Sequence, residues 1–258
     1  MNGDPQIFPS RPQLLGYPVD SLDVQDAVSR VDTFVKKGGF HHIVAINANK
    51  LWLAEQVPAL KKIVRQAELV IPEYAIVWAC RTIRKPLKAH VGGIMLLKAL
   101  LPWLESESVP VYFLGAKATV LERMKSRLTA MHPQLAIAGM RSGYFEASQE
   151  KEIVHEINRS RAAILFVAMG TPRQELWIER HRHNLAVRVV MGVGGSFDVL
   201  AGVKKDAPPW VRHGGEWLYR LIQDPKNLWK RYLTTNPWFV YRVLRERILG
   251  EGGSGELI

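Results

Sequence analysis

Residues 162–181 read AAILFVAMGTPRQELWIERH, an apolar run that ends in a tight corner and leads into a polar, helix-like segment. The run is rich in branched and aromatic side chains and does not alternate polar with apolar residues, which is typical of a strand buried on both faces. The corner is Gly-Thr-Pro, residues 170–172, and Gln174 and Glu175 open the segment that follows. A buried strand that runs directly into a helix is the repeating unit of an α/β fold.

Similar apolar runs recur before residue 195, and helical patterns lie between most of them. In residues 21–37, valines recur at helical spacing on one face, and Ser21 is placed to cap the helix. Strands and helices that alternate in this way predict an α/β fold with a doubly wound, mainly parallel sheet of about six strands. We expect the strands at residues 41–48, 68–72, 109–115, 135–140, 162–170 and 187–195.

The chain has 258 residues and a net charge of +11, which indicates an anionic partner such as nucleic acid, a phosphorylated substrate or acidic lipid. Its single cysteine, Cys80, excludes a disulfide framework and lies in an apolar stretch that favours core packing. No signal peptide and no apolar run of the ~20 residues that span a bilayer are visible. We therefore expect a cytoplasmic protein that at most lies on a membrane surface.

The C-terminal part is more basic and more aromatic than the rest. Residues 203–249 carry ten Lys or Arg against four acids, and four of the eight tryptophans. This composition suits a lipid interface, single-stranded nucleic acid, or a structural helical pair with its charges in water. We predict a core at 1–202, a basic helical appendage at 203–249 and a flexible tail at 250–258.

In a doubly wound sheet, ligands bind beyond the carboxyl ends of the strands. At one of these ends, Gly170 permits a sharp turn and Pro172 suits the first turn of a helix, whose N-terminus attracts anions. Gln174 could add a neutral donor to a pyrophosphate or a sugar hydroxyl. The alternative is a plain strand-to-helix turn, with Gln174 and Glu175 in solvent.

Two other strand ends, in the runs at residues 187–195 and 41–48, carry candidate residues. Gly192 and Gly194 repeat the glycine-rich corner, and Asp198 follows them either as a functional acid or as a helix-start residue. Asn47 and Asn49 lie two apart, so both can point to one side, toward sugar hydroxyls or a uracil edge, unless they only cap a turn.

Glu73 follows a short apolar run and has apolar neighbours, a setting that suits a general base working near neutral pH; its alternative is a solvated loop residue. The histidines and acids show no metal-ligand spacing, and no Asp-x-Asp pair is present. We therefore expect neither a metal nor another cofactor.

Taken together, these residues resemble the WecG/TagA/CpsF family of bacterial glycosyltransferases, from about Leu15 to Arg247. The similarity is most specific in GTPRQELW (170–177), in SGYF (142–145), and in a long block at 192–232 that begins GVGGSFDVLAG. It implies a Rossmann-like core and an inverting, metal-independent transfer of a hexose from a UDP-sugar to a polyprenyl-diphosphate-linked saccharide. The reaction would serve bacterial surface or extracellular polysaccharide synthesis, at the inner face of the cell membrane.

The resemblance also implies roles for single residues. The family's catalytic aspartate falls on Glu73, its Thr-x-Asn motif on Asn47-Ala48-Asn49, and its glutamine on Gln174. The appendage would close over the site and dock on anionic membrane, with three arginines near the lipid diphosphate. The predicted catalytic residues are thus Glu73, Asn49 and Gln174, and the predicted substrate-binding residues are Asn47, Gly115, Tyr144, Gly170, Pro172, Gly192, Gly194, Asp198, Arg212, Arg220 and Arg231.

Several positions depart from the family pattern. Glu73 replaces aspartate and Tyr74 replaces glycine, while Asn47 stands where threonine is usual. An acid is missing at 92–94, which reads Gly-Gly-Ile, and Asp206 replaces an arginine. These departures favour an altered donor, for example glucose in place of an N-acetylated sugar or a uronic derivative.

Two other functions stay open on the sequence alone. The departures are also compatible with a catalytically inactive homologue that acts as an assembly partner. The basic, tryptophan-rich C-terminal part is compatible with a nucleic-acid-binding protein, although no nucleic-acid motif is present, and we expect no nucleic-acid partner. The donor sugar, the acceptor and the choice between a monomer and a homo-oligomer are not determined by the sequence.

Overall fold

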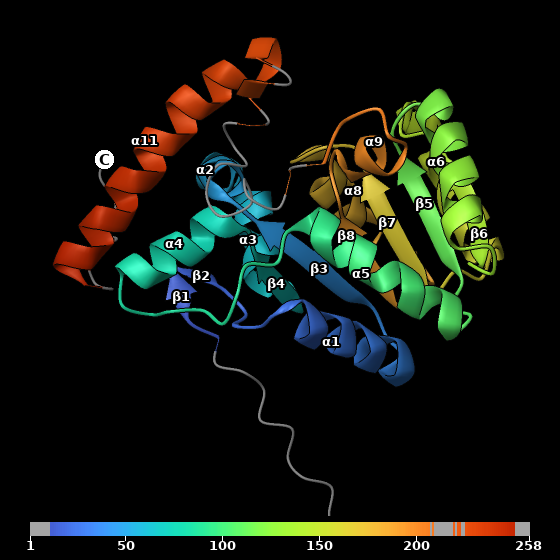
Figure 1. Ribbon diagram of the computed structural model, residues 1–258, viewed down its shortest axis with the longest axis horizontal. Helices are drawn as coiled ribbons and strands as arrows, with labels where there is room; N and C mark the ends of the chain where they lie inside the picture. The colour runs from blue at the N-terminus through green and yellow to red at the C-terminus, as the bar shows by residue number, and fades with distance from the viewer. Residues whose placement is uncertain (1–10, 207, 209–218, 220, 223–224, 251–258) are drawn as a thin grey trace, which may run out of the picture.

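The computed structural model describes residues 11–206, 208, 219, 221–222 and 225–250 (Figure 1). Its centre is a sheet of six parallel strands in the order β4-β3-β8-β7-β5-β6. This confirms the predicted α/β, Rossmann-like fold, and each expected strand is present within a few residues of its predicted bounds. The strands are β3 (His41–Ile46), β4 (Leu69–Pro72), β5 (Val111–Gly115), β6 (Ile137–Arg141), β7 (Ile164–Ala168) and β8 (Val189–Gly192).

Helices cover both faces of the sheet, as parallel strands require, because each crossover must run back over a face. The described helices are α1 (Val24–Lys37), α2 (Ala48–Gln56), α3 (Pro58–Gln66), α4 (Tyr74–Thr82), α5 (Gly93–Ser106), α6 (Ala118–Met131), α7 (Glu150–Arg159), α8 (Arg173–His181), α9 (Ser196–Leu200) and α11 (Pro225–Leu249). A 3₁₀ turn, η1 (Ala147–Gln149), precedes α7, and a short hairpin, β1 (Gln13–Leu14) with β2 (Tyr17–Pro18), precedes α1.

The hydrophobic core lies on both faces of the sheet because successive side chains of a strand point in opposite directions. In β3, Ile43 and Ala45 pack into the cluster formed with α1, α5, α6 and α9. Val44 and Ile46 pack on the other face, with α2, α3 and α4. Most strand residues are therefore apolar on both faces of the sheet, which explains why the strand sequences lack polar alternation.

The N-cap of helix α1 lies two residues later than the predicted Ser21 cap. Its N-cap is Asp23, whose Oδ1 accepts from the Asp26 N–H at 2.9 Å, while Asp26 Oδ2 accepts from the Asp23 N–H at 3.0 Å. The Ser21 prediction is wrong because this reciprocal capping box satisfies the helix start. Ser21 instead accepts a hydrogen bond from the Lys88 N–H, at 3.1 Å.

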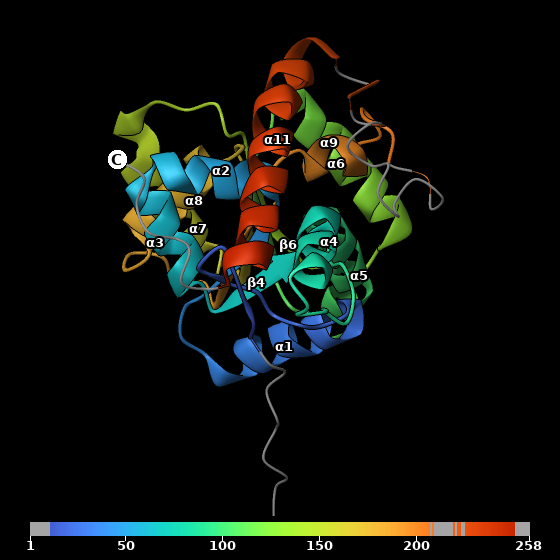
Figure 2. The same cartoon turned by 90° about the vertical axis from the view of Figure 1, so that its left-hand side faces the viewer.

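Helix α11 makes up most of the described part of the predicted C-terminal appendage, and it runs beside α2 and α4 (Figures 1 and 2). Phe239 and Val243 are 2% and 0% exposed and join the cluster that contains Val44 and Ile46. Glu246 accepts from the Leu15 N–H at 2.8 Å, and Arg247 donates to the Thr82 carbonyl. This helix therefore shares a core with residues 11–206, while the division at 202 and the tail at 250–258 stay predictions.

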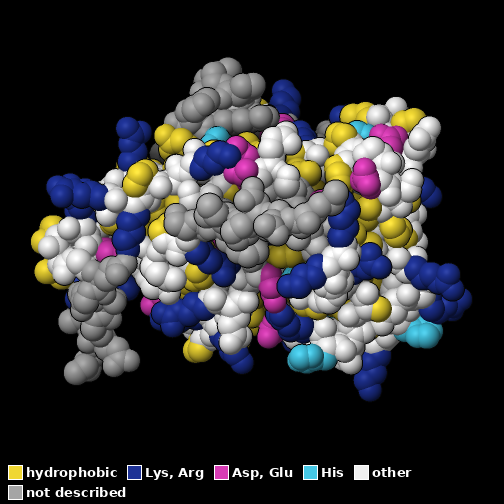
Figure 3. Space-filling model, turned by 90° about the horizontal axis from the view of Figure 1, so that it is seen from below, with side chains coloured by type: hydrophobic (Ala, Val, Ile, Leu, Met, Phe, Trp, Pro, Cys, Tyr) yellow, Lys and Arg dark blue, Asp and Glu magenta, His cyan; other side chains and the backbone are white. Residues whose placement is uncertain are grey.

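The surface of the molecule shows the excess of basic side chains that the net charge of +11 indicates. Figure 3 shows Lys and Arg side chains spread over one face of the molecule, with fewer acids between them. Among the described residues, no helix combines the length and the apolar character needed to cross a membrane.

Candidate functional site

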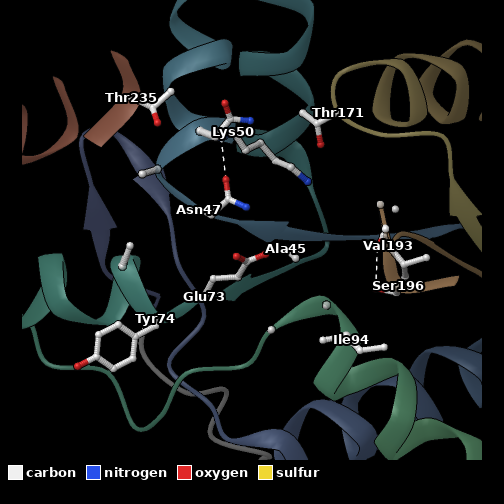
Figure 4. Close-up of a pocket in the computed structure, with 18 of the residues that line it drawn as sticks. Ala45, Asn47, Lys50, Glu73, Tyr74, Ile94, Thr171, Val193, Ser196 and Thr235 are labelled. Atoms are coloured by element: carbon white, nitrogen blue, oxygen red, sulfur yellow. Dashed lines mark hydrogen bonds between the residues drawn. The ribbon is translucent and has the colours of Figure 1, made fainter. Parts of the chain in front are cut away.

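A cavity of about 670 Å³ opens at the carboxyl ends of β4, β3, β8 and β7, four strands that adjoin one another in the six-stranded sheet (Figure 4). Each strand ends in a loop that starts the next helix, so the loops meet above the sheet edge, where ligands bind in this fold. The predicted site residues that line the cavity are Asn47, Asn49, Glu73, Gly170, Gln174, Gly192, Gly194 and Arg231.

Glu73 lies between β4 and α4, at the N-cap position of the helix. Its backbone N–H donates to the Ile46 carbonyl at 3.0 Å, which holds the loop after β4 against the end of β3. The side chain is half-buried, and its carboxylate points into the cavity toward the amide of Asn47 (Figure 4). Glu73 thus lies in the cavity wall, and its role as a base stays a prediction.

Asn47 caps α2, because its Oδ1 accepts from the Lys50 N–H at 2.9 Å. Strand β3 ends at Ile46, and Asn49 lies in the first turn of α2. The argument that Asn47 and Asn49 continue the strand and share a side is therefore wrong, since capping turns the chain into a helix at Asn47. Both residues nevertheless line the cavity, because the first turn of α2 faces it.

Both ends of the Gln174 side-chain amide form hydrogen bonds within the protein. Its Oε1 accepts from the N–H groups of Gly170, at 3.2 Å, and Gly194, at 3.1 Å, and its Nε2 donates to Glu175 at 2.8 Å. Gln174 and Glu175 are 2% and 1% exposed, so the solvent-exposed alternative for the corner is wrong. Because the Gly170 N–H donates to Gln174, it is not available to an anion, and the corner offers one backbone donor fewer than the sequence predicted.

Sequence reasoning missed a buried ion pair beneath the cavity. The Lys50 Nζ lies 2.7 Å from Glu175 Oε1, and the two side chains are 5% and 1% exposed. Burial raises the pKa of the Glu175 carboxyl, but the Lys50 ammonium and the hydrogen bonds from Lys50 and Gln174 outweigh burial and hold this pKa below its usual range. No local pattern joins a lysine on α2 to a glutamate on α8, so no sequence signal could have found the pair.

His42, in β3, is 1% exposed and lies in the field of this ion pair. Burial is the main cause that lowers its pKa from 6.5 to about 4; Lys50 adds to this effect and Glu175 opposes it. The imidazole is therefore neutral in the folded protein at neutral pH.

The lowered pKa of His42 predicts a loss of stability in mild acid. Between pH 6.5 and about 4 the unfolded chain binds a proton at His42 and the folded chain does not, so the free energy of unfolding falls as pH falls. At about 1.4 kcal/mol per pKa unit, the loss amounts to ~3 kcal/mol across this window. Urea denaturation at several pH values should show this slope in the wild type and a smaller one in His42→Leu; equal slopes would contradict the assignment.

Four of the predicted substrate-binding residues do not line this cavity. Tyr144 follows β6 at the far edge of the sheet and is 70% exposed, while Pro172 is the N-cap of α8 and does not contribute to the cavity wall. Asp198 lies in the first turn of α9, with Oδ2 4.0 Å from Lys204 Nζ, in agreement with its helix-start alternative. Gly115, at φ +142°, passes so close to β7 that a Cβ would lie 2.4 Å from the Ala168 carbonyl oxygen, which gives this glycine a structural reason.

Arg231 is the predicted arginine that the structure places, and it lines the cavity from α11. Its Nη2 lies 3.3 Å from the Tyr232 hydroxyl, to which it donates. Arg212 and Arg220 lie outside the described residues, and their predicted contact with a lipid diphosphate stays a prediction. Other residues of α11 that complete this wall are Tyr232, Thr235, Asn236, Phe239 and Val240.

Two of the positions that depart from the family pattern lie together at another wall. Asp206 lines the cavity, and its Oδ2 is 2.6 Å from the Nζ of Lys98 on α5. The segment Gly92–Ile94 lines the cavity at the start of α5. Within the part of the chain that the structure describes, no group of three or more His, Cys, Asp or Glu side chains is arranged to hold a metal. The expected independence from metal stays a prediction.

The fold and this cavity define a Rossmann-like α/β protein that binds its ligand at the carboxyl edge of the sheet. Within that class, the chain belongs to the WecG/TagA/CpsF family of glycosyl transferases, whose model matches residues 12–252. A relative from Bacillus spizizenii, N-acetylglucosaminyldiphosphoundecaprenol N-acetyl-beta-D-mannosaminyltransferase, is 33% identical over 238 residues, and the match covers 88% of this chain and 90% of the relative. The chain is thus a glycosyltransferase.

Proposed function

We propose that this glycosyltransferase moves a hexose, either glucose or an N-acetylhexosamine or uronic derivative, from a UDP-sugar to a polyprenyl-diphosphate-linked saccharide during polysaccharide synthesis. The observation that carries the proposal is the position of Glu73. It stands where the family has its catalytic aspartate, and its carboxylate points into a cavity of about 670 Å³ at the ligand-binding edge of the sheet. The activity named for the Bacillus spizizenii relative supports a lipid-linked acceptor.

The proposed reaction is a single in-line displacement with inversion. An acceptor hydroxyl oxygen attacks the anomeric carbon of the donor as Glu73 takes the proton of that hydroxyl. The new glycosidic bond forms while the bond from the anomeric carbon to UDP breaks, and UDP leaves with the electron pair. Asn47, whose amide faces Glu73, is placed to orient the sugar or the attacking hydroxyl.

Cationic groups of the protein would stabilise the charge that develops on UDP. Arg231 brings a guanidinium to the cavity from α11, and the N-terminal end of α8 adds a partial positive charge at the opposite wall. Lys50 is less suited to this task, because its ammonium already pairs with Glu175. The proposed chemistry needs no metal, in line with the family resemblance.

The acceptor's lipid would place the enzyme on an anionic membrane at its inner face. Helix α11 supports this part of the proposal, because Trp229, Leu233, Leu244 and Ile248 are exposed and recur at helical spacing on one side of it. Lys230 and Arg245 belong to the same helix and suit anionic headgroups.

Vesicle binding tests this membrane surface. Replacing Leu233 and Ile248, which are 66% and 79% exposed, by serine is expected to weaken partitioning onto anionic vesicles at least tenfold. Burying one such side chain contributes roughly 1.5–3 kcal/mol, so two are ample for this loss. Co-sedimentation measures the effect, with Met131→Ser, an equally apolar exposed change on α6, as the control. Unchanged sedimentation of the double variant would refute the proposed surface.

The function itself is tested by acceptor-dependent UDP release from the purified full chain in EDTA. UDP-glucose, UDP-GlcNAc, UDP-ManNAc and a UDP-uronic acid are each offered with a polyprenyl-diphosphate-linked sugar in detergent. Release with one donor identifies the sugar and supports metal independence. Silence with all donors and with acceptors of several lengths favours the inactive assembly partner, which the replacement of aspartate by Glu73 also suggests.

A further inference from the structure

One hydrogen-bond network joins the loops that follow three adjacent strands. Lys50, on α2 after β3, reaches Glu175 on α8, which follows β7. Gln174 continues the network by donating to Glu175 and by accepting from Gly194, which follows β8. Because β3, β8 and β7 are neighbours in the sheet, the network spans the floor of the cavity.

Three hydrogen bonds to the Glu175 carboxylate converge on one of its oxygens. Oε1 accepts from the Lys50 Nζ at 2.7 Å, from the Gln174 Nε2 at 2.8 Å and from the Thr171 hydroxyl at 3.1 Å. The other oxygen, Oε2, is buried without a hydrogen-bond partner among the described residues. The three groups that donate to Oε1 are therefore held in place by packing and by the negative charge of the carboxylate.

This arrangement determines which way the Gln174 amide faces. An amide has a donor end and an acceptor end. Because Oε1 of Glu175 only accepts, the NH₂ end of Gln174 must face it, and the carbonyl oxygen must face the two glycine N–H groups. Space for the amide comes from Gly192, where a Cβ would lie 2.5 Å from the Gln174 Nε2.

From this geometry we propose that Glu175 is a positioning residue of the transferase: its Oε1 orients the Gln174 amide, which holds Gly170 and Gly194 at a fixed separation on the cavity wall. Lys50 balances the buried negative charge, so that the acceptor is tolerated in the core. The inference rests on the proposed function for its effect on turnover, but not for its effect on the loops.

Two double variants that differ in one functional group test the proposal. Lys50→Met with Glu175→Gln removes both charges but retains an oxygen acceptor at the position of Oε1. Lys50→Met with Glu175→Leu removes the charges and the acceptor. Both are expected to fold, because neutral replacements of a buried ion pair are commonly tolerated. Thermal melts of both variants establish this before any comparison.

The first readout does not depend on activity. In the wild type and in the Gln-containing double variant, the backbone amides of Gly170 and Gly194 are expected to exchange slowly with deuterated solvent, as measured by NMR. In the Leu-containing variant, both amides are expected to exchange at least tenfold faster, while amides in β5 keep their protection. Equal exchange at the two glycines in both double variants would overturn the proposal.

The second readout is turnover. The Leu-containing variant is expected to lose 10- to 100-fold in kcat with KM for the acceptor changed less than threefold, and the Gln-containing variant is expected to lie within about threefold of wild type. Equal kcat values in the two folded variants would overturn the proposal. A wild type without transferase activity would refute the proposed function alone, because the exchange comparison still decides the role of Glu175.

Discussion

Replacing Glu73 by glutamine is expected to lower kcat by roughly 10²–10⁴-fold, the usual contribution of a general base. Glutamine has nearly the same shape, so the cavity and the backbone contact of residue 73 with Ile46 should be retained. UDP binding, measured by calorimetry, should therefore stay within a fewfold of wild type. Initial rates of UDP release with the active donor measure the loss in turnover.

Two companion variants sharpen this test. Glu107→Gln changes an exposed acid away from the cavity and is expected to leave the rate unchanged. Glu73→Asp restores the residue that is usual in the family but withdraws the carboxylate by one methylene, so an intermediate rate is expected. A Glu73→Gln protein that retains more than about a third of the wild-type rate would exclude this residue as the base.

Replacing Val243 by aspartate is expected to detach α11 from the rest of the protein. Val243 is 0% exposed and packs in the cluster shared by α2, α4 and the first hairpin. An uncompensated buried charge costs on the order of 3–5 kcal/mol, a large part of the 5–15 kcal/mol that stabilises a typical domain. Because α11 supplies a wall of the cavity, turnover should fall at least 100-fold.

The neighbouring position provides a matched control for this variant. Leu244 is 46% exposed on the same helix, so Leu244→Asp introduces the same charge without burying it. Tryptic cleavage at the arginines of α11 should accelerate strongly in Val243→Asp and little in Leu244→Asp. Equal cleavage of the two proteins, together with equal rates of UDP release in detergent, would show that the packing of α11 is not needed to form the site.

The strands were predictable because most of them are buried on both faces and are therefore largely apolar; β6, at the sheet edge, is only partly buried. The order of the strands was not predictable, since residues in β3 pair with residues in β8 that lie far along the chain. Helix boundaries were less certain for a local reason: Asp23 and Asp26 form a capping box that a single serine at position 21 does not reveal.

The candidate site was predictable where a residue follows a strand and where the family motif marks it, as for Glu73 and Gln174. Its internal partnerships were not, because the Lys50 contact to Glu175 joins two helices that meet only in the folded sheet. Gly115 and Tyr144 were assigned to the site because they follow strands or belong to a motif. The sheet order places β5 and β6 at the far side, away from the cavity.

The position of β8 has a consequence for synthesis of the protein. Strand β8 lies between β3 and β7, and thereby joins the β4–β3 pair to the β7–β5–β6 group. A nascent chain that has not yet reached residue 189 therefore holds two sheet fragments whose facing edges are unpaired, and unpaired edges invite aggregation. The six-stranded sheet can therefore close only after residues 189–192 have been synthesised.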